Sequence, residues 1–253
     1  MLITAKILCY DMLNFFRNQF TYVFSCVLLT SLASTALRYI FSPLYEQLVN
    51  IDIQSSAVNV NVINISFIQS VRQLSLEQQL ILLKASLASF FSNLVGSALL
   101  IGGLLTVIHQ ISNYHIFDIR RVIILSVKII PRLVLLIFLI TLLVQFGLLL
   151  IIVPGIFLAI VFSLAPIISI RDSLGIIKSM HLSFYLVINN FRLLSPAILF
   201  WLLAKIIVLI FAMQFTLSQS LTGLFLLTGL SNLVSSLLLI YLYRLYMLLC
   251  PAK

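Results

Sequence analysis

Six long apolar stretches dominate this 253-residue chain and leave almost no choice of fold class. Hydrophobic residues make up 62% of the chain and charged residues only 8%, whereas soluble domains carry about 25% charged residues. A bilayer core of roughly 30 Å needs about 20 apolar residues per helix. The stretches cover residues 20–41, 87–108, 133–153, 156–170, 193–215 and 224–249, and only the fourth is short. Because lipid forces every backbone polar group to be satisfied internally, we predict an all-α, polytopic membrane protein with six transmembrane helices in a single domain, 1–253.

The basic residues lie mostly on one side of this predicted bundle. If both termini share a side, three basic residues, Arg38, Arg72 and Lys84, fall on the other. The positive-inside bias makes the rich side cytoplasmic, so we predict the cell inner membrane, two cytoplasmic termini and a periplasmic loop at 42–86. The net charge of +9 then indicates the anionic lipids of the inner leaflet as partners, and not nucleic acid. The residues of the rich side are Lys6, Arg17, Arg120, Arg121, Lys128, Arg132, Arg171, Lys178, Arg192, Arg244 and Lys253.

Three segments on the predicted cytoplasmic side, 3–18, 117–130 and 173–189, mix large apolar residues with a few basic ones at helical spacing. They indicate amphipathic helices that lie in the membrane interface. Asp172 or Ser173 can cap the start of the third. Each segment precedes an outward span, which gives a threefold plan. Internal duplication and independent selection for basic-aromatic junctions both explain that plan.

The connections on the other side carry two turn signals. Ser75 and Gln78 stand in the pattern of a capping box, which predicts a helix that starts near Leu76 and runs directly into the second span. Pro154-Gly155 combines a fixed φ with a residue that accepts positive φ, which predicts a tight turn between the third and fourth spans.

Two residues inside the spans are candidates for function. Lys205 lies well within the fifth span, where a charge costs about 2.5–3.5 kcal/mol on insertion scales. Either it faces a polar cavity and meets an anion, or it snorkels toward the headgroups and pairs with nearby polar groups. Pro166 is expected to kink the fourth span and free a carbonyl, and interrupted helices are found at transporter sites.

No pattern of residues points to catalysis or to a cofactor. The chain has no phosphate-binding loop, no paired carboxylates and no nucleophile motif, and its histidines, His109, His115 and His181, do not have the spacing of a metal site. The three cysteines form no disulfide framework. We therefore expect a protein that is not an enzyme and binds no cofactor.

Six segments along the chain carry a resemblance to a known family when they are taken in combination. They are NFFRNQF at 14–20, SLEQQLILLKAS at 75–86, LLVQFG at 142–147, VPGI at 153–156, WLLAK at 201–205 and IYLYRLYML at 240–248. These segments resemble the YciC-type inner-membrane proteins of enterobacteria. The resemblance covers nearly the whole chain and implies a multi-pass inner-membrane protein without catalytic residues to assign. A looser similarity, around Pro154 to Pro166, is to membrane domains attached to some bacterial glycerophosphodiester phosphodiesterases, whose soluble domain is missing here.

Two functions fit these observations. The first is non-enzymatic organisation or maintenance of the envelope through lipid or protein contacts, which the basic face and the interfacial helices favour. The second is a carrier or flippase-like transporter of a small or anionic amphiphile, which Lys205 and Pro166 favour. A membrane-protein partner and a homo-oligomer both remain open.

Overall fold

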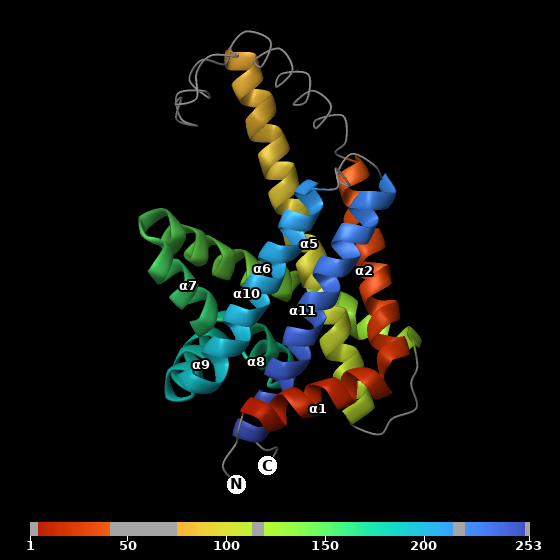
Figure 1. Ribbon diagram of the computed structural model, residues 1–253, viewed down its shortest axis with the longest axis vertical. Coiled ribbons are helices and arrows are strands. Elements are labelled where there is room, and N and C mark those ends of the chain that lie inside the picture. Colours follow the sequence, from red (N-terminus) through yellow and green to blue (C-terminus); the bar gives the residue numbers. More distant parts are fainter. Residues whose placement is uncertain (1–4, 41–74, 113–118, 215–220, 251–253) are drawn as a thin grey trace.

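The computed structural model describes residues 5–40, 75–112, 119–214 and 221–250, and these residues form helices joined by short connections (Figure 1). Six regions within them are long and apolar enough to cross a membrane, which confirms the predicted fold class. Their bounds agree with the predicted spans within four residues, except that the second begins at Leu76, 11 residues before the predicted start. The helices that provide them are α2 (Phe20–Ile40), α5 (Leu76–Ser112), α6 (Ile119–Leu150), the pair α7 (Ile152–Val161) and α8 (Ala165–Arg171), α10 (Phe191–Gln214) and α11 (Leu221–Leu249).

Helix α5 begins at the predicted capping box. The Gln78 amide donates to Ser75 Oγ over 3.3 Å, and the Ser75 amide donates to Gln78 Oε1 over 3.0 Å. The helix then continues for 37 residues, roughly 55 Å at 1.5 Å per residue, so its first turns project beyond the other helices (Figure 1). Of the predicted loop 42–86, residues 42–74 lie outside the described part of the chain, and the remainder belongs to the start of α5.

Two of the three predicted amphipathic segments form separate helices, α1 (Ala5–Asn18) and α9 (Ile176–Asn189). Each is followed after a single residue, Gln19 or Asn190, by a long span. Figure 1 places α1 across one end of the molecule, beside the end of α11. The first and last described helices therefore meet at the same end of the bundle.

The prediction of a separate helix at 117–130 is wrong. Helix α6 runs without a break through Pro131 into the third span. A proline inside a helix removes one backbone hydrogen bond and usually ends the helix. Here Ile129 packs against a buried cluster just before the proline, and Leu133 and Leu136 are completely buried just after it. With this packing on both sides the segment stays helical, so only the first and third segments of the threefold plan form helices separate from their spans.

The turn predicted at Pro154-Gly155 is also misplaced. The chain reverses at Ile151, whose backbone is extended (φ −156°, ψ 146°), and both predicted turn residues lie in the first turns of α7. Proline is tolerated in the first turn of a helix because that amide lacks an intrahelical partner anyway. Gly155 instead permits close contact, since a Cβ atom there would lie 2.7 Å from the Leu148 nitrogen of α6.

The fourth span is interrupted, as Pro166 suggested. Helix α7 ends at Val161, and α8 begins at Ala165 with Pro166 in its first turn. The chain is closely packed on both sides of the break, since Val161 of α7 and Ala165 of α8 are fully buried. Pro166 is thus the start of a new helix after a break, and it does not lie within a continuous kinked helix.

The predicted cap of α9 is wrong as well. Its N-cap residue is Gly175, without a side-chain hydrogen bond, while Asp172 ends α8. Ser173 adopts a left-handed conformation with φ 52°. The Asp172 carboxylate accepts a hydrogen bond from the Tyr246 hydroxyl of α11, so this acid ties two spans together and does not cap α9.

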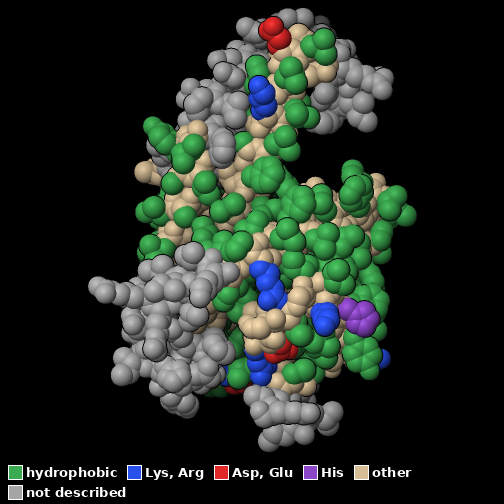
Figure 2. Space-filling view, turned by 180° about the vertical axis from the view of Figure 1, so that it is seen from behind, with side chains coloured by type: hydrophobic (Ala, Val, Ile, Leu, Met, Phe, Trp, Pro, Cys, Tyr) green, Lys and Arg blue, Asp and Glu red, His purple; other side chains and the backbone are tan. Residues whose placement is uncertain are grey.

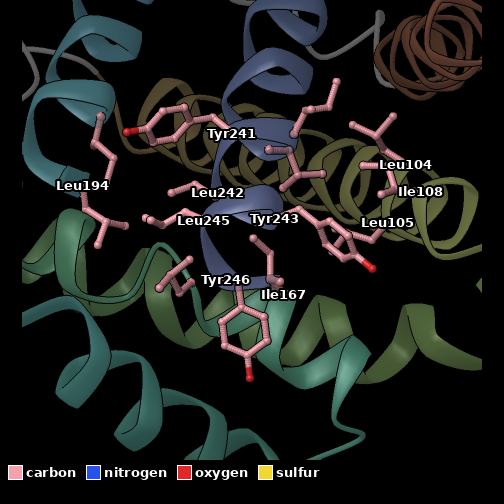
Figure 3. Packing of buried hydrophobic residues seen from close by; sticks show 14 of the residues in the cluster. Leu104, Leu105, Ile108, Ile167, Leu194, Tyr241, Leu242, Tyr243, Leu245 and Tyr246 are labelled. Carbon is pink, nitrogen blue, oxygen red and sulfur yellow. The ribbon is translucent and has the colours of Figure 1, made fainter. Parts of the chain in front are cut away.

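The largest buried cluster lies where α1, α5, α8 and α11 meet (Figure 3). Tyr246 and Leu245 of α11, Leu104 of α5, Ile167 of α8 and Leu8 of α1 are almost completely buried in it. By contrast, α10 packs on α11 with one side and exposes much of the other, where Phe200, Leu203 and Ile207 are 74%, 58% and 65% exposed. The bundle is therefore tightly packed at the end that holds α1 and more open to its surroundings elsewhere.

Candidate functional site

Lys205 contacts the neighbouring span through a polar group. It is half-buried on α10, and its ammonium group donates a hydrogen bond to Ser231 Oγ of α11. By residue count it lies about 21 Å from the start of α10 and about 14 Å from its end. A lysine at this depth is costly unless its ammonium group finds a hydrogen-bond acceptor, and the Ser231 hydroxyl is that acceptor.

Trp201, one turn before Lys205, forms the second wall of this site. The Lys205 nitrogen lies 5.6 Å from the centre of the indole ring, a distance at which the ring face attracts a cation. The indole Nε1 is enclosed and has no hydrogen-bond partner. The helices α2, α10 and α11 contain no Asp or Glu, so Lys205 is held by a hydroxyl and an aromatic face, and not by a counter-ion.

Further polar groups continue from Ser231 toward α2. The Asn232 side chain donates weakly to Thr30 Oγ1, over 3.5 Å. Thr30 itself donates to the carbonyls of Cys26 and Val27, as serines and threonines inside membrane helices commonly do. These groups are thus used mainly within the bundle. The Lys205 site is a small polar contact between helices, in which a lysine ammonium group meets a serine hydroxyl.

The second group of candidate residues surrounds the end of the bundle at which α8 and α11 finish. Arg171 Nη2 donates to the Cys250 carbonyl over 3.1 Å, and its guanidinium lies 5.1 Å from the Tyr246 ring centre. Arg132 Nη1 donates to the Ser173 carbonyl over 3.3 Å. Arg244 lies 4.9 Å from the ring centre of Phe15 in α1. Through these three arginines, α8 contacts the end of α11, α6 contacts the residues that follow α8, and α11 contacts α1.

The remaining predicted basic residues are more exposed or undescribed. Arg17, Lys178 and Arg192 are exposed at the end of α1, in the first turn of α9 and at the start of α10. Figure 2 shows Lys and Arg side chains gathered in the lower part of the molecule, below a broad hydrophobic belt. The side chains of the five other predicted residues, Lys6, Arg120, Arg121, Lys128 and Lys253, lie outside the described part of the structure.

The structure adds partners that the sequence did not identify. Ser231 and Trp201 as partners of Lys205, and Asp172 as the acceptor of Tyr246, come from tertiary packing. Only the four-residue spacing from Trp201 to Lys205 was a usable signal, because residues four apart share a helix face. Among the described residues, no group of three or more His, Cys, Asp and Glu could hold a metal ion.

Comparison with known proteins identifies the relatives of this chain. A family model described as "Uncharacterised protein family (UPF0259)" matches residues 1–248. A UPF0259 membrane protein of Sodalis glossinidius is 57% identical over 251 residues, which cover 99% of both chains. Relatives with the same description in Serratia proteamaculans (98% of both chains) and Yersinia pestis (99% of this chain, 98% of the relative) are 44% and 41% identical. No solved structure matches the chain.

Proposed function

The chain belongs to the UPF0259 family of membrane proteins, and we propose that it maintains the cell envelope through lipid or protein contacts without catalysing a reaction. We place it in the cell inner membrane with both termini in the cytoplasm. The observation that carries this proposal is the basic end of the bundle, where half-buried arginines and exposed basic residues lie below six apolar spans.

The orientation is supported by the position of this basic end. The start of α1 and the end of α11 lie together (Figure 1), and Arg171 and Arg244 lie near the ends of α8 and α11 in the same region. Lys178 and Arg192 are exposed nearby along the chain. Basic residues are retained on the cytoplasmic side of inner-membrane proteins, where anionic lipids attract them.

The surfaces of α1 and α9 support lipid contact at this end. On α1, Ile7 is 56% and Tyr10 66% exposed, while Leu8 on the opposite face is fully buried. On α9, Ile177 is 79% and Phe184 45% exposed. A helix that packs one face on the bundle and leaves apolar residues on the other is suited to the interface between headgroups and acyl chains.

The experiment is to purify the full chain from its native membrane and identify the lipids that remain bound. The proposal expects anionic phospholipids to be enriched over their share in the bulk membrane. Reporter fusions near Asn61 and after Lys253 should report periplasm and cytoplasm, respectively. Co-purified lipid of bulk composition would remove the lipid part of the proposal, and a periplasmic carboxyl terminus would reverse the orientation.

The requirement for the chain in the envelope has a separate test. A deletion strain should lose resistance to detergents or to osmotic stress, and the plasmid-borne chain should restore it. If deletion leaves permeability and stress resistance unchanged in every condition tried, the maintenance role is wrong even if lipid is bound.

A carrier or flippase-like function is the second candidate, and the Lys205–Ser231 contact favours it. A positive charge held between two spans can receive the headgroup of an anionic amphiphile. Replacing Lys205 by Ala or Met should then abolish activity while the protein still reaches the membrane in normal amounts. If both variants fully complement the deletion, the carrier function is excluded.

A further inference from the structure

We propose that Arg132 and Arg171 form a specific site for the phosphate group of an anionic phospholipid at the basic end of the bundle. This inference rests on the proposed function, because it assumes that the basic end faces lipid headgroups. It goes further by assigning the contact to two guanidinium groups and to one chemical class of ligand, a phosphodiester joined to acyl chains.

The two arginines come from different spans and lie at the same end of the bundle, Arg132 against the α8–α9 connection and Arg171 against the end of α11. Arg171 is the last residue of α8, and Arg132 comes from the middle of α6. Arg132 reaches the α8–α9 connection by donating to the Ser173 carbonyl, only two residues after Arg171. A phosphate site made of both arginines therefore exists only in the folded protein, because the fold brings α6 and α8 together.

Each guanidinium keeps a nitrogen that the described chain does not satisfy. Arg132 Nη1 and Arg171 Nη2 donate to carbonyls, whereas Arg132 Nη2 and Arg171 Nη1 are enclosed without a hydrogen-bond partner. An enclosed charged donor without an acceptor is costly. Both side chains are half-buried, so these nitrogens become available to a ligand once the guanidinium groups turn toward the surface. A phosphate group then offers several charged acceptor oxygens in a geometry that matches the planar guanidinium fork.

The local charges also favour an anion. The nearest acid along the chain is Asp172, and its Oδ2 atom accepts from the Tyr246 hydroxyl. Among the residues that the structure describes, no ion pair joins Arg132 or Arg171 to a carboxylate. Two positive groups and one negative group leave a net positive charge at the α8–α9 connection, which a phosphodiester would neutralise.

The surroundings distinguish a lipid from a soluble phosphate. The connection lies between the end of a membrane span and α9, where Ile177 is 79% exposed, and Leu248 near the end of α11 is 49% exposed. Gly175 at the start of α9 is open, with no atom within 4 Å of the position a Cβ would take. A phospholipid whose phosphate lies at the arginines could therefore place its acyl chains against these apolar residues. Inorganic phosphate would gain nothing from this apolar surface.

The test is a lipid titration of the delipidated full-length protein, followed by native mass spectrometry. The probes are phosphatidylglycerol and cardiolipin, with phosphatidylcholine as the neutral comparison. Arg132→Gln and Arg171→Gln should each weaken binding of the anionic lipids about tenfold or more, because a charged hydrogen bond is lost. Arg192→Gln is the matched control, since it removes one exposed charge from the same end and should change binding less than about twofold.

Each outcome has a separate meaning. Equal losses in all three variants would overturn the specific site and leave only diffuse attraction, so the proposed function would survive. No preference for anionic lipid in the wild-type protein would overturn the site together with the lipid part of the proposed function. If inorganic phosphate at millimolar concentration displaces the lipid, the arginines bind soluble phosphate and not specifically a phospholipid. If a Gln variant is not monodisperse, Arg132→Lys and Arg171→Lys keep the charge but not the fork, and wild-type binding by both would refute the site.

Discussion

The hairpin of α6 and α7 depends on two glycines, and their substitution provides the most quantitative test of the fold. A Cβ atom added at Gly147 would lie 2.8 Å from the Gly155 Cα atom, and one added at Gly155 would lie 2.7 Å from the Leu148 nitrogen. Both neighbours are backbone atoms, which cannot rotate away as a side chain can. Gly147→Ala and Gly155→Ala must therefore push the two helices apart.

The size of the effect follows from these distances. Ordinary contact begins near 3.4 Å, so Gly147→Ala requires the helices to separate by about 0.6 Å. Overpacking costs about 1–3 kcal/mol, and contact with backbone atoms places this substitution in the upper part of that range, at about 2–3 kcal/mol. The better helix propensity of Ala returns about 1 kcal/mol. A net loss of about 1–2 kcal/mol corresponds to a midpoint lower by roughly 2–8 °C for a chain of this size.

The assay is the temperature at which half of the monodisperse protein is lost from a size-exclusion profile in detergent. Gly229→Ala is the matched control, because its added Cβ would come no closer than 3.9 Å to another atom, Ser31 Oγ. That variant should keep or slightly raise the midpoint. The double variant Gly147→Ala/Gly155→Ala should lose less than the sum of the single losses, since both atoms open the same gap.

The reasoning is refuted if Gly147→Ala and Gly155→Ala both retain the wild-type midpoint within about 1 °C while Gly229→Ala does the same. Equal stability would mean that the hairpin is not packed as closely as the glycine distances require. A loss in all three variants would instead show that glycine matters in these helices for a reason other than close approach.

Three further substitutions test separate contacts. Ser75→Ala removes the α5 cap and should speed hydrogen exchange in the first turn, at a cost of about 1 kcal/mol; unchanged exchange would contradict the capping box. Ser231→Ala deprives Lys205 of its acceptor and should lower the detergent midpoint more than Ser235→Ala, whose hydroxyl only donates to its own helix; equal midpoints would show that the lysine does not need the serine. Tyr246→Phe removes the hydroxyl that joins α11 to the end of α8 and should increase protease cleavage of the α8–α9 connection; wild-type cleavage would mean that other contacts hold it.

The spans and the start of α5 were predictable because they depend on local rules. A backbone in lipid must form helices, so hydropathy alone located all six spans. The cap at Ser75 needs only residues within one turn. Such features require no knowledge of what else in the chain lies nearby, and the structure agrees with them.

The errors arose where tertiary packing overrides local preference. Pro131 has a strong tendency to end a helix, yet α6 continues through it, with Ile129 packed on a buried cluster before it and Leu133 and Leu136 buried after it. Pro154 is as compatible with the first turn of a helix as with a tight turn, and nothing local decides between them. Asp172 can cap a helix, but its carboxylate instead accepts a hydrogen bond from the Tyr246 hydroxyl, 74 residues later.

The partners of the candidate sites were unpredictable for the same reason. Lys205 was conspicuous in sequence because a charge is rare inside an apolar helix. Its acceptor, Ser231, is one of many serines in the spans, and only the packing of α10 on α11 selects it. Likewise, the pairing of Arg132 with the α8–α9 connection depends on the crossing of α6 and α8.

The distribution of packing also bears on where function resides. In a bilayer, burying one apolar side chain against another gains little over contact with lipid, so close packing and hydrogen bonds between helices must hold the bundle. Both are concentrated at the basic end, where Tyr241 donates to the Leu193 carbonyl and Tyr246 to Asp172 within the largest buried cluster. The end we assign to lipid headgroups is thus also the most constrained part of the described chain. A rigid frame of this kind is what two guanidinium groups from different spans require to hold a fixed geometry for a phosphate.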